Sequence, residues 1–262
     1  MRRRGALRNR SDRAVFLCYH SVAAEGPRYL TVTAELFERQ LATLRGRGYR
    51  SGGRAELDEL AADVPGAPTV FLTFDDGFID NYTTVMPLLR EYGFRAFCFV
   101  LPPLVDTGGP LVWTEMVADL ARFPATMRSV TWDQVGEMAE GEFEIGAHTL
   151  THPHLPSLDG EQLRSELSDS RARVKERLGH CDTIAYPFGE FDDEVAAAAR
   201  ECGYSYAFTL PTGVGQREAT PWTIPRVNVD YRDEGRRFDL KLSRRGRSAI
   251  LSPVINRIRN RR

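Results

Sequence analysis

Short apolar runs recur along this 262-residue chain, and each is followed by a stretch with helical spacing. The runs long enough for strands lie at residues 15–19, 70–74, 95–101, 143–147, 183–186, 204–210 and 223–229. Most are continuously apolar, which is typical of parallel strands buried on both faces. The alternation with helices predicts an α/β fold of about seven parallel strands, and both a barrel and an open doubly wound sheet fit this order.

Helices are expected between the runs, at residues 33–48, 81–92, 114–121, 133–139, 159–178 and 192–202. Thr33 can cap the first of them, and residues 102–110 are expected to form a loop. No glycine-rich phosphate motif follows a strand, so a dinucleotide or P-loop site has no support. The simplest organisation is one domain at 14–231, with a basic extension at 1–13 and a basic tail at 232–262.

The net charge of −1 conceals a strong partition of charge along the chain. Residues 1–13 hold six arginines and one aspartate, and residues 232–262 hold eleven basic and three acidic side chains, so the body between them is acidic. Solvated ends are the simpler interpretation, and attachment to an anionic surface is the alternative. Nucleic acid is not an expected partner, because the basic ends lack interleaved aromatic residues and the acidic body would repel phosphate.

The carboxyl-terminal end carries an amphipathic pattern with four arginines from Arg257 onward, and Pro253 limits any helix to a start near residue 252. Its apolar residues at helical spacing are Ile250, Leu251, Val254, Ile255 and Ile258. Such a segment could lie on an anionic membrane surface. Packing against the body of the protein, or disorder, is the simpler alternative.

The sequence also favours one cellular location for the protein over others. No apolar run approaches the ~18 residues of a membrane-spanning helix. The apolar stretch at residues 14–19 is too short for a secretory signal and ends at a histidine. Cys18, Cys98, Cys181 and Cys202 show no CxxC spacing and are expected to be reduced core residues. The prediction is a cytoplasmic protein, which the basic tail could bring into peripheral contact with the inner face of the membrane.

Chemically active residues gather where the predicted strands end. His20, Asp75, Asp76 and His148 lie at the ends of three such runs, and a Pro-Phe-Gly turn containing Phe188 follows another. In parallel α/β folds the carboxyl ends of the strands share one rim, where catalytic groups collect. We therefore expect these residues to meet at one mouth of the fold.

The strongest local pattern is His148-Thr-Leu-Thr-His152. Two imidazoles at i and i+4 lie on one face if the segment forms a helical turn, at a separation suited to one shared metal ion. An anionic oxygen or a sulfur must complete the site, and two histidines with one carboxylate are the usual pattern for a metal that activates water. The alternative is a surface histidine cluster, and His154 is expected to be an exposed bystander.

The adjacent aspartates can take separate roles. In an extended segment the side chains of Asp75 and Asp76 point in opposite directions, so one can bind the metal while the other acts as a base. The alternative is ordinary turn chemistry, since Asp-Asp-Gly also favours a turn. His20 is a further candidate, although a lone histidine at a strand end is more often structural.

Three motifs in this order, TFDDGF at 73–78, HTLTH at 148–152 and YPFG at 186–189, resemble those of the polysaccharide deacetylases of carbohydrate esterase family 4. The resemblance covers about residues 14–230 and implies the NodB-like fold, a distorted (β/α) barrel. The early LCYHSV segment and the helix after it resemble the branch that acts on poly-N-acetylglucosamine and related exopolysaccharides. In that branch the fold is circularly permuted, and an amino-terminal histidine replaces the usual carboxyl-terminal one.

The resemblance implies roles for individual residues. Asp75 matches the catalytic base, His20 the general acid, and the metal ligands correspond to Asp76, His148 and His152. The third motif departs from the family pattern, because Ala185 replaces the usual arginine and Phe188 the usual tyrosine. The backbone amide near Phe188 could still donate to an oxyanion. Arg226 is the candidate for the missing positive charge, and a surface arginine is the alternative.

The function implied is metal-dependent hydrolysis of the N-acetyl group of an amino sugar in a glycan or glycolipid precursor. Zinc is the first choice of ion, with cobalt, nickel or manganese as alternatives. The sequence leaves two other functions open. One is a non-catalytic glycan-binding relative, and the other is a deacylase for a formyl or O-acetyl group.

Overall fold

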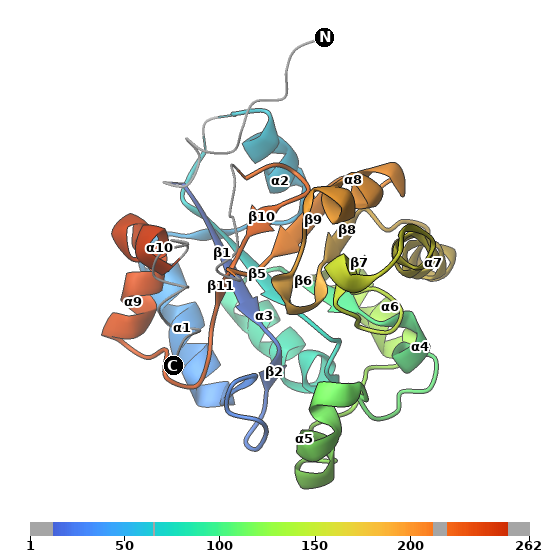
Figure 1. The fold of residues 1–262 in the computed structure, drawn as a ribbon. Helices are drawn as coiled ribbons and strands as arrows, with labels where there is room; N and C mark the ends of the chain where they lie inside the picture. The colour runs from blue at the N-terminus through green and yellow to red at the C-terminus, as the bar shows by residue number, and fades with distance from the viewer. Residues whose placement is uncertain (1–12, 65, 212–218, 251–262) are drawn as a thin grey trace.

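The computed structural model describes residues 13–64, 66–211 and 219–250 and has a parallel sheet at its centre with helices around it (Figure 1). The strands of this sheet are β1 (Ala14–Tyr19), β4 (Arg50–Ser51), β5 (Thr69–Phe74), β6 (Ala96–Val100), β7 (Phe143–Ala147), β8 (Thr183–Ala185), β9 (Tyr206–Thr209), β10 (Ile224–Pro225) and β11 (Val227–Asn228). Their spatial order is β10-β9-β8-β7-β6-β5-β1-β11, with β4 beside β5. Every strand pairing in this sheet is parallel, as connections through helices require.

A single short segment brings the two edges of the sheet together. β10 pairs with β9, β11 pairs with β1, and Arg226 alone separates β10 from β11. The backbone N–H of Arg226 donates to the carbonyl of Thr209 at 3.0 Å, and that of Val229 donates to the carbonyl of Cys18 at 2.8 Å. The predicted strand at 223–229 is therefore two short strands, because its two halves face different neighbours. This arrangement confirms the distorted barrel and excludes the open sheet.

Strand alternation decides which side chains face the interior of the barrel. Phe71 of β5 belongs to an apolar, largely aromatic cluster with members from β1, β6, β8, β9 and β10. A cluster shared by strands around the sheet fills the interior of the barrel. Val70 and Leu72, the neighbours of Phe71, belong to the larger core beneath the helices. Because successive side chains alternate, Thr73 and Asp75 continue the inward set of Phe71. The same period places Cys18 and His20 on one side of the chain that leaves β1.

Five helices form where the sequence predicts them. They are α1 (Ala34–Gly46), α3 (Met86–Tyr92), α6 (Trp132–Glu140), α7 (Gly160–Leu178) and α8 (Asp193–Glu201). Thr33 caps α1 by accepting a hydrogen bond from the N–H of Leu36 at 3.2 Å. Gly93 ends α3 with a φ of 71°, a left-handed conformation that glycine adopts without strain. The predicted helix at 81–92 begins as a π-helical segment, η2 (Asn81–Val85).

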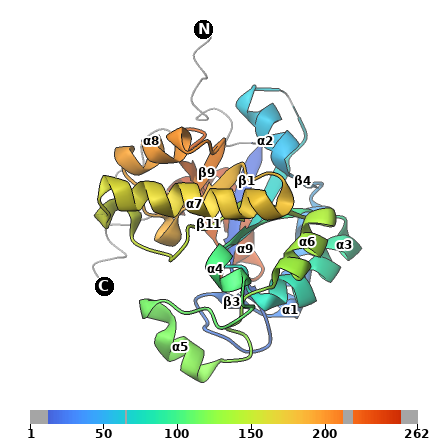
Figure 2. The ribbon, with the colours of Figure 1, turned by 90° about the vertical axis from the view of Figure 1, so that its right-hand side faces the viewer.

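Several short elements were not predicted. The expected loop at 102–110 starts with α4 (Pro102–Val105), because proline suits the first turn of a helix. The expected helix at 114–121 is divided into η3 (Thr114–Met116) and α5 (Val117–Arg122). α2 (Arg54–Ala61) and the pair β2 (Ser21–Val22) and β3 (Thr31–Val32) are additional. Figure 2 shows α5 projecting from the body beside the β2–β3 connection.

The folded body continues past residue 231. α9 (Arg236–Leu242) and α10 (Arg244–Ile250) follow β11, and Phe238 and Leu242 are buried in the larger core. The predicted tail at 232–262 therefore starts too early, because these two apolar residues one helical turn apart dock α9. Residues 1–12 of the predicted extension and residues 251–262, which hold most of the predicted amphipathic pattern, lie outside the described residues. No helix among the described residues is long and apolar enough to cross a membrane.

Replacement of Phe238 tests the place of α9 in the fold. Phe238→Ala removes a side chain that is 2% exposed and should lower the free energy of unfolding by about 3–5 kcal/mol. Leu240→Ala, on the same helix at 56% exposure, is the matched control and should change it by less than about 0.5 kcal/mol. Urea denaturation measures both values, and equal small effects would mean that α9 is not part of the core.

Candidate active site

The carboxyl ends of β1, β5 and β7 bring the predicted site residues to one rim of the barrel. The N–H of Asp75 donates to the carbonyl of Tyr19 at 3.0 Å, which ties the end of β5 to the end of β1. The N–H of His148 donates to the carbonyl of Val100 at 2.8 Å, which ties the end of β7 to β6. The parallel register of the strands therefore brings His20, Asp75 and His148 to the same rim, and this alignment does not require contacts between their side chains.

Asp76, His148 and His152 form a compact, buried cluster. Asp76 Oδ1 lies 3.3 Å from His148 Nε2 and 3.6 Å from His152 Nε2. The ligand atoms of the three residues lie within 4.8 Å of one another. Asp76 Oδ1 is buried without a hydrogen-bond partner of good geometry, as is Nδ1 of His152. Buried polar atoms normally have partners, so this cluster has the donor set and the unmet coordination of a metal site.

The backbone reaches this arrangement through left-handed residues. Asp76 has a φ of 73°, Thr149 of 68° and His152 of 60°. The helical turn that would place His148 and His152 on one face does not form, and the segment reverses through irregular backbone instead. A left-handed conformation costs a residue other than glycine about 1–2 kcal/mol. Strain of this kind persists where the surroundings hold it in place, and it is concentrated at functional sites.

Hydrogen bonding and charge prepare the cluster for a cation. The carbonyl of Ala185 lies 2.8 Å from His148 Nδ1, which orients the ring with Nε2 toward Asp76. Burial lowers the pKa of His152 to about 4 and keeps this imidazole neutral. Burial opposes ionisation of Asp76, but the two histidines outweigh it and lower the pKa of the carboxyl. An ionised carboxylate and a neutral imidazole are the forms that bind metal. Burial alone would lower the pKa of His148, but the contact with Asp76 and the charges of the two aspartates outweigh burial and raise it, so a cation would compete with a proton for this ring.

Asp75 faces the barrel interior and forms an ion pair with Arg226. Arg226 Nη1 and Nη2 donate to Asp75 Oδ1 and Oδ2 at 2.6 and 2.7 Å, and Nη1 also donates to Thr73 Oγ1 at 2.9 Å. Arg226 is fully buried, which rules out the alternative of a surface arginine. Burial alone would raise the pKa of Asp75, but Arg226 more than offsets it and holds that pKa well below its usual range. Arg226 therefore places a buried positive charge directly against Asp75.

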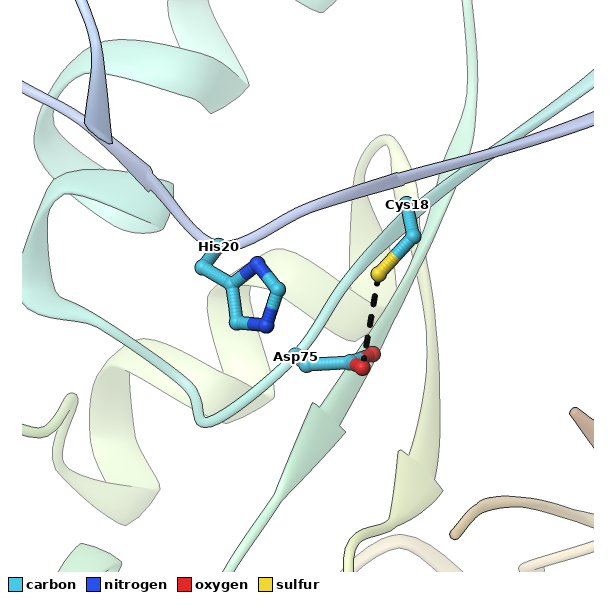
Figure 3. Close-up of side chains that lie close together, drawn as sticks. All are labelled: Cys18, His20 and Asp75. Carbon is cyan, nitrogen blue, oxygen red and sulfur yellow. Dashed lines mark hydrogen bonds between the residues drawn. The ribbon is translucent and has the colours of Figure 1, made fainter. Parts of the chain in front are cut away.

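His20 and Cys18 complete the surroundings of Asp75, as Figure 3 shows. Cys18 Sγ lies 3.5 Å from Asp75 Oδ2, and the nearest ligand atoms of Cys18, His20 and Asp75 lie within 4.8 Å of one another. This trio is a poor cation site, because Arg226 occupies both carboxylate oxygens and burial raises the pKa of the Cys18 thiol well above its ordinary value. Burial lowers the pKa of His20, so its imidazole is neutral at neutral pH.

Two residues that sequence reasoning missed hold the backbone at His20. Asp80 accepts hydrogen bonds from Ser21 Oγ at 2.7 Å and from the N–H of Val22 at 2.8 Å. Asn81 Nδ2 donates to the carbonyl of His20 at 2.8 Å. Both follow the DDGF motif within five residues, which is the one sequence signal that could have indicated them. They link the rim of β5 to the chain that leaves β1.

Aromatic side chains border the cluster of Asp76, His148 and His152. Trp113 stacks on His152 with ring centroids 4.2 Å apart, and Phe188 meets His152 edge-on at 4.6 Å. Phe188 has a φ of 58°, an unusual conformation for a bulky side chain. His154 stacks on Phe188 at 4.1 Å and pairs with Glu190 at the surface, outside the cluster. Sequence reasoning missed Trp113, because a lone aromatic residue in a loop has no diagnostic spacing.

A cavity of 840 Å³ lies at the same end of the barrel. It opens between the β2–β3 connection, α5 and Tyr231, and its walls carry both aromatic and charged side chains. Arg28 and Tyr231 pack together there, with the guanidinium 5.2 Å from the ring centroid. Its volume lies within the range of small-molecule sites, about 300–1,000 Å³. The cavity is large enough for a ligand bigger than an acetyl group, and its lining contains none of the site residues described above.

The sequence is similar to known deacetylases over most of its length. A family model described as polysaccharide deacetylase matches residues 62–207. The putative polysaccharide deacetylase YxkH of Bacillus subtilis is 28% identical over 226 residues, which cover 85% of this chain and 73% of that protein. The poly-beta-1,6-N-acetyl-D-glucosamine N-deacetylase of Escherichia coli K12 is 25% identical over 251 residues, covering 82% of this chain and 36% of that enzyme. This chain therefore corresponds to a minor part of the E. coli enzyme.

Solved structures share the fold. The Streptococcus pyogenes deacetylase PplD, solved in complex with acetate, has a TM-score of 0.74 at 23% identity and covers 88% of this chain and 98% of its own. IcaB from Ammonifex degensii has a TM-score of 0.67 at 24% identity and covers 84% of this chain and 93% of its own. The match at 62–207 spans more than half of the chain and includes Asp75, Asp76, His148, His152 and Phe188, but not His20 or Arg226. On this evidence, the chain belongs to the polysaccharide deacetylase family.

Proposed function

We propose that this protein is a metal-dependent hydrolase that removes N-acetyl groups from an amino sugar within a glycan or glycolipid precursor. Family membership makes carbohydrate deacetylation its reaction class. The observation that carries the finer proposal is the division of labour between two adjacent carboxylates. Asp76 meets two imidazoles, whereas Asp75 meets Arg226 and His20. Neighbouring carboxylates in such different environments are suited to different chemical roles.

Asp76, His148 and His152 would hold the metal ion. Two imidazole nitrogens and one carboxylate oxygen suit zinc first, and cobalt, nickel or manganese are alternatives. Oδ1 of Asp76 is buried beside both imidazoles without a hydrogen bond of good geometry, and it fits this role because a cation would satisfy it. When bound, the ion would supply a Lewis acid that makes water easier to deprotonate and polarises the acetyl carbonyl.

Asp75 is the proposed base. Its two hydrogen bonds to Arg226 keep it ionised and fix the plane of the carboxylate, so it is ready to accept a proton from water at neutral pH. The strongly lowered pKa makes it a weak base, and its effect would come from position more than from proton affinity. Arg226 acts here by holding Asp75 and not by contact with the substrate.

His20 is the proposed acid. Its imidazole is neutral at neutral pH, so it can receive the proton that Asp75 takes from water and deliver it to the departing amine nitrogen. Ligand atoms of His20 and Asp75 lie within 4.8 Å of each other, a separation that one water molecule can bridge, so the proton would pass between them through water. The backbone amide near Phe188 is the proposed donor to the developing oxyanion, and Phe188 packs against His152. The products would be the free amino sugar and acetate.

Mass spectrometry of candidate glycans tests the proposal. Purified protein with zinc or cobalt should remove acetyl groups from N-acetylated glycan oligomers and release acetate, and a chelated sample should not. Release of formate, or loss of acetyl from O-acetyl esters alone, would support the deacylase alternative. Glycan binding without turnover under every metal would support the non-catalytic alternative.

Metal analysis tests the ligand set. His148→Ala and His152→Ala should each reduce the bound ion to well below one per chain, because each removes one of three protein ligands. The matched control is His154→Ala, which alters a surface histidine outside the cluster and should bind like wild type. Inductively coupled plasma mass spectrometry of the purified variants gives the stoichiometry. Unchanged metal content in both ligand variants would contradict the assignment.

Variants of the proton-transfer residues separate their roles. Asp75→Asn should abolish turnover and leave the ion bound, because Asp76 and the histidines are unchanged. His20→Ala should lower kcat by about 10²–10⁴-fold if protonation of the amine limits the rate. Steady-state kinetics on an amide substrate, with metal content measured in parallel, checks both. Near-normal activity of His20→Ala would show that another group protonates the amine.

Arg226 can be tested through stability as well as activity. Arg226→Met leaves Asp75 as a buried charge without its partner, which should lower the free energy of unfolding at pH 7 by about 3–5 kcal/mol. Asp75→Asn/Arg226→Met should recover part of that loss, because no unpaired charge remains. With Arg226 gone, the pKa of Asp75 rises, so the acid limb of the pH–rate profile should move to higher pH. Additive losses in the double variant would contradict the coupling.

A further inference from the structure

The loop between the two ligand histidines is bonded to Glu166 of α7. Glu166 Oε2 accepts hydrogen bonds from the N–H groups of Leu150 at 2.8 Å and Thr151 at 3.0 Å. Glu166 Oε1 accepts a hydrogen bond from Thr151 Oγ1 at 2.6 Å. Three hydrogen bonds accepted by one carboxylate thus hold Leu150 and Thr151, the residues in the middle of the loop.

This loop needs support from outside itself. Thr149 and His152 are both left-handed, with φ values of 68° and 60°. Such residues return to ordinary conformations unless their surroundings prevent it. Within the loop, Thr149 Oγ1 accepts a hydrogen bond from the N–H of His152 at 3.2 Å. The bonds to Glu166 are shorter, and they attach the loop to another element of the fold.

α7 is a rigid base for that carboxylate. Leu163 and Leu167 are buried on either side of Glu166 along the helix and pack in the larger core. Asp159 caps the helix by accepting bonds from the N–H groups of Glu161 and Gln162. Because packing fixes the backbone of the helix, the position of Glu166 does not depend on the loop that it holds.

We propose that Glu166 is a positioning residue that fixes the His148–His152 loop so that both Nε2 atoms face Asp76, and that it thereby sets the affinity for the divalent ion. This inference rests on the proposed metal site. Glu166 bonds to the backbone between the ligands and acts through them. A loop held in its binding geometry before the ion arrives loses less entropy on binding, which favours affinity.

Three variants test the inference through metal binding alone. Glu166→Ala removes all three bonds and should raise the zinc dissociation constant about 10–100-fold, the usual effect of losing a group that orients metal ligands. Glu166→Gln should bind almost like wild type, because its carboxamide oxygen can accept both backbone bonds and its NH₂ group can donate to Thr151 Oγ1. Glu176→Ala, at an exposed position on the same helix, is the matched control. Competition with a chromophoric chelator gives the dissociation constants.

Amide hydrogen exchange of the metal-free protein provides a second measurement, which does not depend on metal binding. In the metal-free protein, Glu166→Ala should lose the protection of the Leu150 and Thr151 amides, whereas amides of β7 should keep theirs. Should Glu166→Ala fail to fold, as judged by circular dichroism, Thr151→Val replaces it. That variant removes the hydroxyl bond alone and should raise the dissociation constant by a smaller factor.

The outcomes separate this inference from the metal site itself. Wild-type protein that binds none of zinc, cobalt, nickel and manganese overturns both. Wild type and Glu166→Ala with the same dissociation constant overturn the positioning role alone. An equal rise in Glu166→Gln and Glu166→Ala also overturns it, since the negative charge and not the bonds would then control binding. A rise in Glu166→Ala, with Glu166→Gln and Glu176→Ala unchanged, supports it.

Discussion

The buried ion pair between Asp75 and Arg226 is the interaction on which the rest of this structure depends. Its two partners lie 151 residues apart, at the rim of β5 and at the junction of β10 and β11. A buried charge is tolerated when its partner and hydrogen bonds are in place. Closure of the barrel supplies both, because it brings Arg226 against Asp75 and Thr73. The guanidinium also lies 5.6 Å from the ring centroid of Phe99 and 5.8 Å from that of Phe208. Closing the sheet and completing the proposed base are therefore one structural event.

The period of the strands separates the inside of the barrel from its rim. Phe71, Thr73 and Asp75 follow one another at every second residue and face inward, so the carboxylate of Asp75 enters the closed interior. Asp76 departs from this period, because its left-handed backbone turns the chain at the end of β5. Two adjacent carboxylates consequently meet a guanidinium in one case and two imidazoles in the other.

Strain is concentrated around the candidate site. Four residues other than glycine have a left-handed backbone here, namely Asp76, Thr149, His152 and Phe188. All four belong to the candidate metal-ligand cluster or border it. A structure can hold such residues when rigid elements and hydrogen bonds oppose their relaxation. Here the strands fix one end of each turn, and Glu166, Ala185 and Trp113 contact the segments between them.

Local patterns in the sequence determined the order of strands and helices, since apolar spacing and caps act over a few residues. They also indicated the shared rim with His20, Asp75, Asp76 and His148, because parallel strands present their carboxyl ends together. The tertiary structure decided those features that depend on contacts between residues far apart in the sequence. Closure divided the expected strand at 223–229 and gave Asp75 its arginine. Packing of Phe238 and Leu242 docked α9, and residues 148–152 form a strained loop that Ala185 and Glu166 contact. Contacts between segments so far apart follow from strand register and packing, which no local pattern encodes.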